Sequence, residues 1–245
     1  TAGGGHHLKS TPTSFKSIKK EINLYNAILK KNKKLFNKKK FALVIEPGIG
    51  FNHFRVIQAK LKNFKKRLDF SKKNNFVYEA HSADYQKISS LKKLVKNNFK
   101  FLKVGPELTY CFSKAVLEME KIENKFYTKN FSNIKNIIFN EMKNNNQYWI
   151  NYYKGSQKYL NFLKFNSYLD RLRYYWDTQK IINAKKKLYK NINKISNKKF
   201  MKKKEDLVLK QNLKLNNSEF IIFKSIENSL KKYYLACGFK LKKIN

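Results

Sequence analysis

Three short apolar runs in the first part of the chain constrain its fold more than any other sequence feature. They cover residues 41–45, 76–80 and 101–104, and each is followed by a turn or loop sequence. Continuous apolar runs of this length are typical of strands that are buried on both faces. Because segments with helical spacing separate these runs, the sequence predicts an α/β fold with a parallel sheet.

The helical spacing extends well beyond the three strands. Apolar residues recur at helical intervals in 14–30, 54–68, 88–99, 107–126 and 131–142, and 219–236 is predicted to be a further helix. Ser167 and Asp170 have the spacing of a capping box for a helix that begins near Tyr168. Ser218 is the expected N-cap of the last helix and Gly238 its stop. The stretch 185–204, rich in Lys and Asn, is predicted to be an exposed helix end and linker. We therefore expect a strand-containing domain over residues 1–145 and a helical extension over 146–245 that packs on it.

The composition excludes several classes of protein. The 245 residues include only two cysteines, Cys111 and Cys237, in no recognisable motif, which is typical of a reducing cytoplasm and not of a disulfide scaffold. No apolar run approaches the roughly 18 to 20 residues of a membrane-spanning helix. We thus expect a cytoplasmic protein without a membrane partner.

The net charge of +39 suggests a nucleic-acid partner, but the kind of charge argues against one. Only four of the 55 basic residues are arginines, and proteins that read nucleic acid favour arginine for its bidentate bonds. Lysine is instead spread along the whole chain. We interpret the charge as compositional bias on solvated faces and expect no specific nucleic-acid partner, with a functional basic surface as the alternative.

Polar residues lie at or after the C-terminal ends of the predicted strands, where a (β/α) barrel builds its active-site face. They are Glu46, Asn52, His53, Glu79, His81, Asp84, Lys103 and Gly105. The candidate catalytic residues are Glu79, His81 and Lys103. Lys103, Gly105, Asp84 and His53 are candidates for binding a substrate phosphate, and His53 and His81 for binding a metal ion. The alternatives are that the histidines bond loop backbone and that Glu46 and Glu79 form a buried ion pair with Lys103.

The number of strands does not match a closed barrel. A (β/α) barrel needs eight strands in about 250 residues, and only three are predicted here. We therefore expect an incomplete barrel of TIM type, namely the last three strand-helix units of a longer protein, followed by a helical C-terminal region.

Five segments of the chain match a known family in order and approximate spacing. They are VIEPGIGFNH (44–53), VYEAHSADYQ (77–86), FLKVGPELTY (101–110), NQYWINYYKGS (146–156) and DRLRYYW (170–176). In these segments the chain resembles the GatZ/KbaZ-like family, the non-catalytic subunit type of class II D-tagatose-1,6-bisphosphate aldolase. The opening residues 1–12 resemble the loop after the family's fifth strand, and 231–238 resemble its C-terminus. Departures occur at Gly50 and Asn52, where the family usually has acidic residues, and at Asp177, where it has proline.

The resemblance implies an accessory subunit that supports the stability and activity of a zinc-dependent catalytic aldolase subunit in galactitol-type sugar catabolism. On this view the zinc belongs to the partner, and the chain itself is predicted to bind no cofactor and to lack enzymatic activity alone. The alternative is a stand-alone sugar-phosphate enzyme, either a lyase or a tagatose 6-phosphate kinase, that acts at the barrel mouth.

Overall fold

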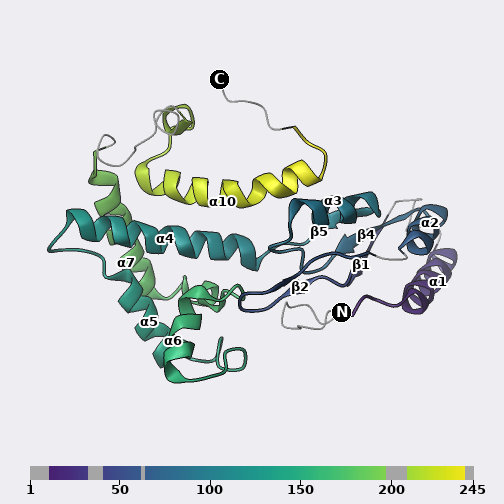
Figure 1. Ribbon diagram of the computed structural model, residues 1–245, viewed down its shortest axis with the longest axis horizontal. Helices are drawn as coiled ribbons and strands as arrows, with labels where there is room; N and C mark the ends of the chain where they lie inside the picture. Colours follow the sequence, from purple (N-terminus) through teal and green to yellow (C-terminus); the bar gives the residue numbers. More distant parts are fainter. Residues whose placement is uncertain (1–10, 33–40, 62–63, 197–208, 241–245) are drawn as a thin grey trace. The chain divides into compact units, whose positions relative to one another are not determined.

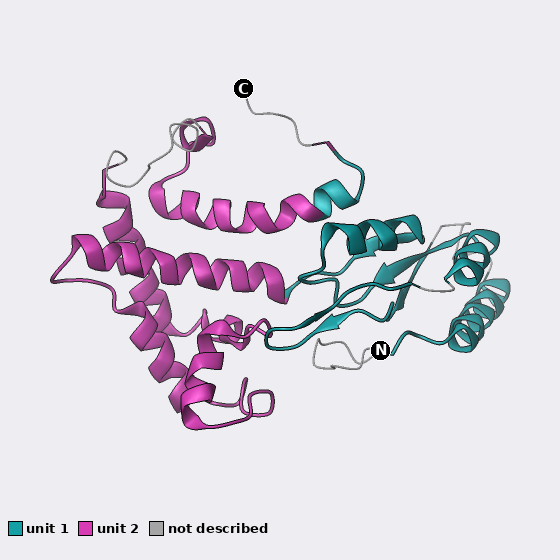
Figure 2. Ribbon diagram, in the orientation of Figure 1, with its two compact units in different colours: residues 1–105, 233–239 teal, residues 106–232, 240–245 magenta. Residues whose placement is uncertain are grey.

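The computed structural model describes residues 11–32, 41–61, 64–196 and 209–240 and divides into two compact units. Unit 1 comprises residues 1–105 and 233–239, and unit 2 comprises residues 106–232 and 240–245 (Figure 2). The division falls just before Pro106. The domain boundary predicted between residues 145 and 146 stays a prediction.

A three-stranded parallel sheet forms the centre of unit 1 (Figure 1). Its strands are β1 (Phe41–Ile45), β4 (Phe76–Ala80) and β5 (Phe99–Leu102), in the order β1-β4-β5. The predicted α/β fold with a parallel sheet is thereby confirmed, although β5 begins two residues earlier than the sequence indicated.

One face of this sheet is buried and the other is open. Residues Tyr78 and Phe99 point into a core that they share with Ile18 of α1 (Phe15–Lys31) and Leu91 of α3 (Ile88–Lys96), all at most 1% exposed. In the next row, Val44 pairs with Glu79 and Glu79 with Phe101. Because side chains alternate between the faces of a sheet, this row lies on the other face, where Val44 is 37% and Phe101 54% exposed.

The predicted helix over 54–68 is wrong in its first part. That stretch contains strand β3 (Val56–Ile57), which pairs antiparallel with β2 (Gly50–Phe51), and helix α2 (Lys65–Lys73) begins later. The buried side chain of Gln86 accepts a hydrogen bond from the Ala59 N–H and donates one to the Ile57 carbonyl. These bonds occupy backbone groups that a helix would need for itself, so tertiary contacts override the helical spacing.

Unit 2 is helical throughout its described part. Its elements are α4 (Pro106–Phe126), α5 (Ile134–Asn144), α6 (Gln157–Asn166), the 3-10 helix η1 (Arg171–Tyr175), α7 (Gln179–Lys194) and α10 (Asn217–Ala236), of which residues up to Lys232 belong to this unit. Fully buried residues such as Met119, Ile138 and Leu188 join α4, α5 and α7 in one core. Within the described residues, every helix is too short or too polar to cross a lipid bilayer.

Two helix ends in unit 2 differ from the sequence prediction. The helix expected from residue 168 is only the 3-10 turn η1, because Asp170 adopts a left-handed conformation with φ of 41°. The last helix is capped by Asn216 instead of Ser218, since the Asn216 side chain accepts from the Glu219 N–H while Glu219 accepts from the Asn216 N–H. Gly238, at φ of 90°, follows the end of α10 as predicted.

Of the Lys-rich stretch, residues 197–204 lie outside the described part, as do residues 1–10 of the opening segment.

Candidate functional site

Three of the predicted site residues meet at the carboxyl edge of the parallel sheet. Glu46 follows β1, His81 follows β4 and Lys103 follows β5 by one residue. The His81 Nδ1 lies 3.6 Å from the Glu46 Oε1, and the His81 Nε2 lies 3.3 Å from the Lys103 Nζ. We call these residues the strand-end cluster. It places an imidazole between a carboxylate and an ammonium group.

Backbone hydrogen bonds extend the sheet pairing beyond the strands and fix this cluster. The His81 N–H donates to the Ile45 carbonyl at 3.2 Å, and the Lys103 N–H donates to the Ala80 carbonyl at 3.0 Å. Glu46 is held by Thr13, whose hydroxyl accepts from the Glu46 N–H and whose own N–H donates to the Glu46 carbonyl, both at 2.9 Å. The sequence did not predict this role of Thr13, because no local pattern links it to Glu46, which lies 33 residues away.

The contacts of His81 define what the cluster can do chemically. A lysine ammonium is a donor only, so the His81 Nε2 accepts and, in the neutral ring, the Nδ1 carries the proton that faces Glu46. A carboxylate in this place orients the ring. Together the groups can exchange a proton, while the Lys103 ammonium can attract an anion. Lys103 contacts His81 and forms no ion pair with Glu46 or Glu79 in the described structure.

Glu79 lies close to the cluster in sequence but faces the open side of the sheet. It shares a row with Val44 and Phe101 and is half-buried there. Among the described residues, no side chain forms a hydrogen bond or ion pair with its carboxylate. The catalytic role of Glu79 stays a prediction.

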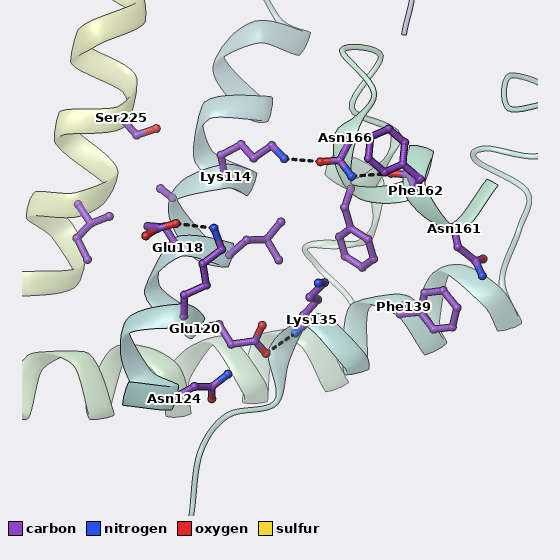
Figure 3. Close-up of a pocket in the computed structure, with 15 residues that line it drawn as sticks. Lys114, Glu118, Glu120, Asn124, Lys135, Phe139, Asn161, Phe162, Asn166 and Ser225 are labelled. Carbon is purple, nitrogen blue, oxygen red and sulfur yellow. Dashed lines mark hydrogen bonds and ion pairs between the residues drawn. The ribbon is translucent and has the colours of Figure 1, made fainter. Parts of the chain in front are cut away.

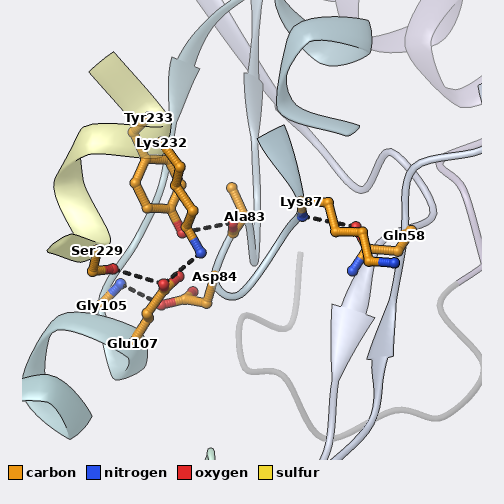
Figure 4. A network of polar contacts seen from close by, with 9 residues as sticks. All are labelled: Gln58, Ala83, Asp84, Lys87, Gly105, Glu107, Ser229, Lys232 and Tyr233. Carbon is orange, nitrogen blue, oxygen red and sulfur yellow. Dashed lines mark hydrogen bonds and ion pairs between the residues drawn. The ribbon is translucent and has the colours of Figure 1, made fainter. Parts of the chain in front are cut away.

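Asp84 and Gly105 are brought together by a direct hydrogen bond (Figure 4). Asp84 is only 3% exposed, and its Oδ1 accepts from the Gly105 N–H at 2.9 Å. Next to it, the Tyr233 hydroxyl donates to the Ala83 carbonyl at 3.1 Å. The Gly105 N–H therefore already has an anionic acceptor. Phosphate binding there stays a prediction, and it would require the Asp84 carboxylate to give way.

His53 lies apart from this cluster in sequence, in the turn between β2 and β3. The turn is closed by Asn52, whose Oδ1 accepts from the Phe54 and Arg55 N–H groups at 3.1 and 2.7 Å. Partial burial lowers the pKa of the His53 ring, since it disfavours the charged form. Among the described residues, no three His, Cys, Asp or Glu side chains are arranged to hold a metal ion. Metal binding by His53 and His81 stays a prediction.

A family model described as D-tagatose-1,6-bisphosphate aldolase subunit GatZ/KbaZ-like matches residues 1–238. The chain belongs to the GatZ/KbaZ-like family. The match spans nearly the whole chain, so the resemblance seen in the five sequence segments is confirmed.

Curated relatives agree with this assignment but are much longer. The D-tagatose-1,6-bisphosphate aldolase subunit GatZ of Salmonella dublin is 32% identical over 156 residues, which are 63% of this chain and 37% of that protein. The subunit of the same name from Escherichia coli O7:K1 is 34% identical over 153 residues, or 62% of this chain and 36% of that protein. The matched region thus spans little more than a third of these relatives.

A solved structure shares the fold. The crystal structure of a probable tagatose 6 phosphate kinase from Sinorhizobium meliloti 1021 superposes with a TM-score of 0.79. It is 23% identical, and the match covers 93% of this chain and 60% of that one. At this identity the likeness concerns the fold alone.

Proposed function

We propose that this chain acts within an accessory, non-catalytic subunit of a class II tagatose-1,6-bisphosphate aldolase. The observation that carries the proposal is the family match over residues 1–238, together with relatives that are themselves named as aldolase subunits. The catalytic subunit would supply the zinc ion and the cleavage of the carbon–carbon bond. The accessory subunit would bind that partner and support its stability and activity.

An activity reconstitution tests this proposal. The full natural polypeptide and the catalytic subunit from the same organism are purified separately, and cleavage of tagatose 1,6-bisphosphate is measured for each and for the mixture. We expect no cleavage by the accessory protein alone, higher activity in the mixture than in the catalytic subunit alone, and co-elution in gel filtration. Unchanged activity combined with separate elution would contradict the proposal.

We further propose that β1, β4 and β5 are adjacent strands of a (β/α) barrel. Three features support this proposal. The strands are parallel, their order in the sheet follows their order in the chain, and helices α1 and α3 share a core with only one face of the sheet. In a barrel, the row Val44, Glu79 and Phe101 would face the interior, where side chains are packed in layers. The open face would then be completed by strands other than these three.

Cysteine labelling tests the barrel proposal. In a background with Cys111→Ser and Cys237→Ser, a thiol is introduced by Phe101→Cys on the open face or by Glu118→Cys on an exposed part of α4. In the 245-residue chain both thiols should react rapidly. In the full natural polypeptide we expect Phe101→Cys to react at least about tenfold more slowly, because barrel interiors exclude reagent. Equal rates of Phe101→Cys in both proteins would contradict the barrel.

The strand-end cluster favours a second candidate, a sugar-phosphate enzyme that acts on its own. His81 between Glu46 and Lys103 provides a proton-transfer group beside a cation that can bind phosphate. Thermal-shift measurements against ketose phosphates, with and without zinc, test this candidate. Stabilisation that Lys103→Gln abolishes would support it, and a flat response across the panel would count against it.

A further inference from the structure

The helical unit contains a cavity that none of the proposed chemistry uses (Figure 3). It has a volume of about 890 Å³ and is lined by residues of α4, α5, α6 and α10. A second cavity of about 300 Å³ shares five lining residues with it, namely Glu120, Asn124, Lys135, Phe139 and Phe165. The two are therefore continuous, and we call them together the helical groove. Their combined size exceeds that of most small-molecule sites, which hold about 300 to 1,000 Å³.

The groove is lined by three lysines, Lys114, Lys121 and Lys135, and by two carboxylates, Glu118 and Glu120, so its lining carries a small excess of positive charge. The Lys121 ammonium is paired with Glu118 at 2.9 Å, but the two other lysines have neutral partners. Lys114 donates to the Asn166 Oδ1 at 2.9 Å, and the Lys135 ammonium lies 5.7 Å from the centre of the Phe165 ring. In the described part of the chain, no carboxylate lies within 4 Å of either ammonium group. Partial burial also lowers the pKa of Lys114, so this cation would gain from an anionic neighbour.

Phenylalanine rings supply the apolar part of the same groove. Phe139, Phe162 and Phe165 line it, and Phe162 is 51% exposed although it is a large apolar side chain. A large groove with aromatic rings and more lysines than carboxylates fits a protein segment that presents both carboxylates and apolar side chains. A phosphorylated metabolite would contact the lysines but would leave much of the groove's volume empty.

The charge of the chain restricts the partner. A second copy of this chain carries the same +39, so the two copies would repel each other at close range. We propose that the helical groove is the docking surface for an acidic, amphipathic segment of the catalytic aldolase subunit. This inference rests on the proposed accessory function and adds the place and the chemistry of the contact.

Binding measurements with matched variants test the inference. The full natural polypeptide is titrated with the catalytic subunit, and the double variant Lys114→Gln/Lys135→Gln is compared with Lys186→Gln/Lys187→Gln, which removes the same charge from exposed positions on α7. Phe162→Ser is compared with Phe126→Ser, since Phe126 is 43% exposed and lies outside the groove. We expect each groove variant to weaken binding about tenfold or more and each control to leave it within about twofold. Circular dichroism and the melting temperature verify that the variants fold.

The possible outcomes separate the two proposals. If the wild type binds and the groove variants bind equally well, the docking surface is wrong while the accessory function stands. If the wild type does not bind the catalytic subunit at all, both fall. If inorganic phosphate or tagatose 1,6-bisphosphate raises the melting temperature of the wild type and not of Lys114→Gln/Lys135→Gln, the groove is a small-anion site and the docking inference is overturned.

Discussion

At the scale of single residues, Asp170 is held in conditions that disfavour a charged carboxylate. It is 4% exposed, and burial raises its pKa to about 6. Its Oδ1 accepts from the Ser113 hydroxyl at 3.1 Å, whereas its Oδ2 has no hydrogen-bond partner among the described residues. The residue also adopts a left-handed conformation, which aspartate and asparagine tolerate better than most residues. Its backbone role can therefore be separated from its charge.

We predict that Asp170→Asn changes how stability depends on pH. The pKa of Asp170 is raised in the folded state, from an ordinary value of 3.8 to about 6. The protonated carboxyl therefore contributes to the free energy of unfolding in full below about pH 4, and this contribution is lost as pH rises through about 6. The variant should match the wild type near pH 4 and become more stable than it by pH 7, by up to about 3 kcal/mol. Denaturant unfolding at a series of pH values measures this difference. The exposed Asp69→Asn serves as the control, and a constant difference between Asp170→Asn and wild type across pH would contradict the prediction.

Gly48 provides a second prediction at the residue scale. Its φ of 83° lies in the left-handed region, and an added Cβ would come within 2.8 Å of the Pro12 side chain. Gly48→Ala should therefore lower the free energy of unfolding by about 1 to 3 kcal/mol. Gly105→Ala is the matched control, because nothing lies within 4 Å of its Cβ position and its φ is not positive. Equal melting temperatures for the two variants would contradict this account.

At the scale of elements, α4 buries carboxylates as well as apolar residues. Glu107 accepts from the Ser229 hydroxyl at 2.6 Å and pairs with Lys232 (Figure 4). Glu123 is fully buried, and it accepts from the Ser132 N–H, the Ser132 hydroxyl and the Asn191 side chain. A buried carboxylate is tolerated only when donors surround it, so these contacts determine which neighbours can pack on the helix.

We predict that Glu123→Ala destabilises the protein far more than a similar change on the exposed side of the same helix. The substitution leaves the N–H and hydroxyl of Ser132 without their acceptor and removes one of the two bonds of the Asn191 amide, so it should lower the free energy of unfolding by about 3 to 5 kcal/mol. Glu118→Ala is the control, because Glu118 is exposed and pairs only with the exposed Lys121, so its loss should cost at most about 1 kcal/mol. Chemical denaturation of both variants measures the difference. Comparable losses would show that the Glu123 network contributes little.

The sequence predicted those elements that depend on local residue patterns and missed those that depend on contacts between distant residues. The strands around Ala42 and Val77 were predictable, because short apolar runs followed by turn or loop residues are local signals. Helix α4 was predicted from the spacing of its apolar residues, and Ala115 and Met119 are buried as expected, whereas Phe126 is exposed. Glu107 and Glu123 were missed because their donors lie far away in sequence or in irregular segments. At the candidate site, His81 and Lys103 were found because they end predicted strands. The groove around Phe162 could not be found, since four helices that are distant in sequence build it.

At the scale of the whole molecule, the excess of positive charge is carried by lysine. Three of the four arginines are engaged within the fold. Arg171 donates to the Tyr148 carbonyl at 2.6 Å, Arg173 to the Leu169 carbonyl at 2.6 Å, and Arg67 to the Thr13 carbonyl at 3.3 Å. The guanidinium groups that could bond base edges or phosphates are thereby largely bonded to backbone carbonyls. The remaining surface attracts polyanions as a diffuse field of lysine charges.

This distribution leads to a prediction about nucleic acid. The chain should bind duplex DNA at low salt through phosphate contacts alone, so its affinity should fall at least about 100-fold between 50 and 200 mM salt. The affinity should also be the same for duplexes of unrelated sequence. Sequence-specific readout relies largely on arginine side chains at base edges, and three of the four arginines of this chain are bonded to backbone carbonyls. Fluorescence anisotropy with two unrelated duplexes over a salt series measures both properties. Binding that persists at 200 mM salt or prefers one duplex by more than about tenfold would show that the basic surface has a function of its own, and the charge could then no longer be attributed to composition.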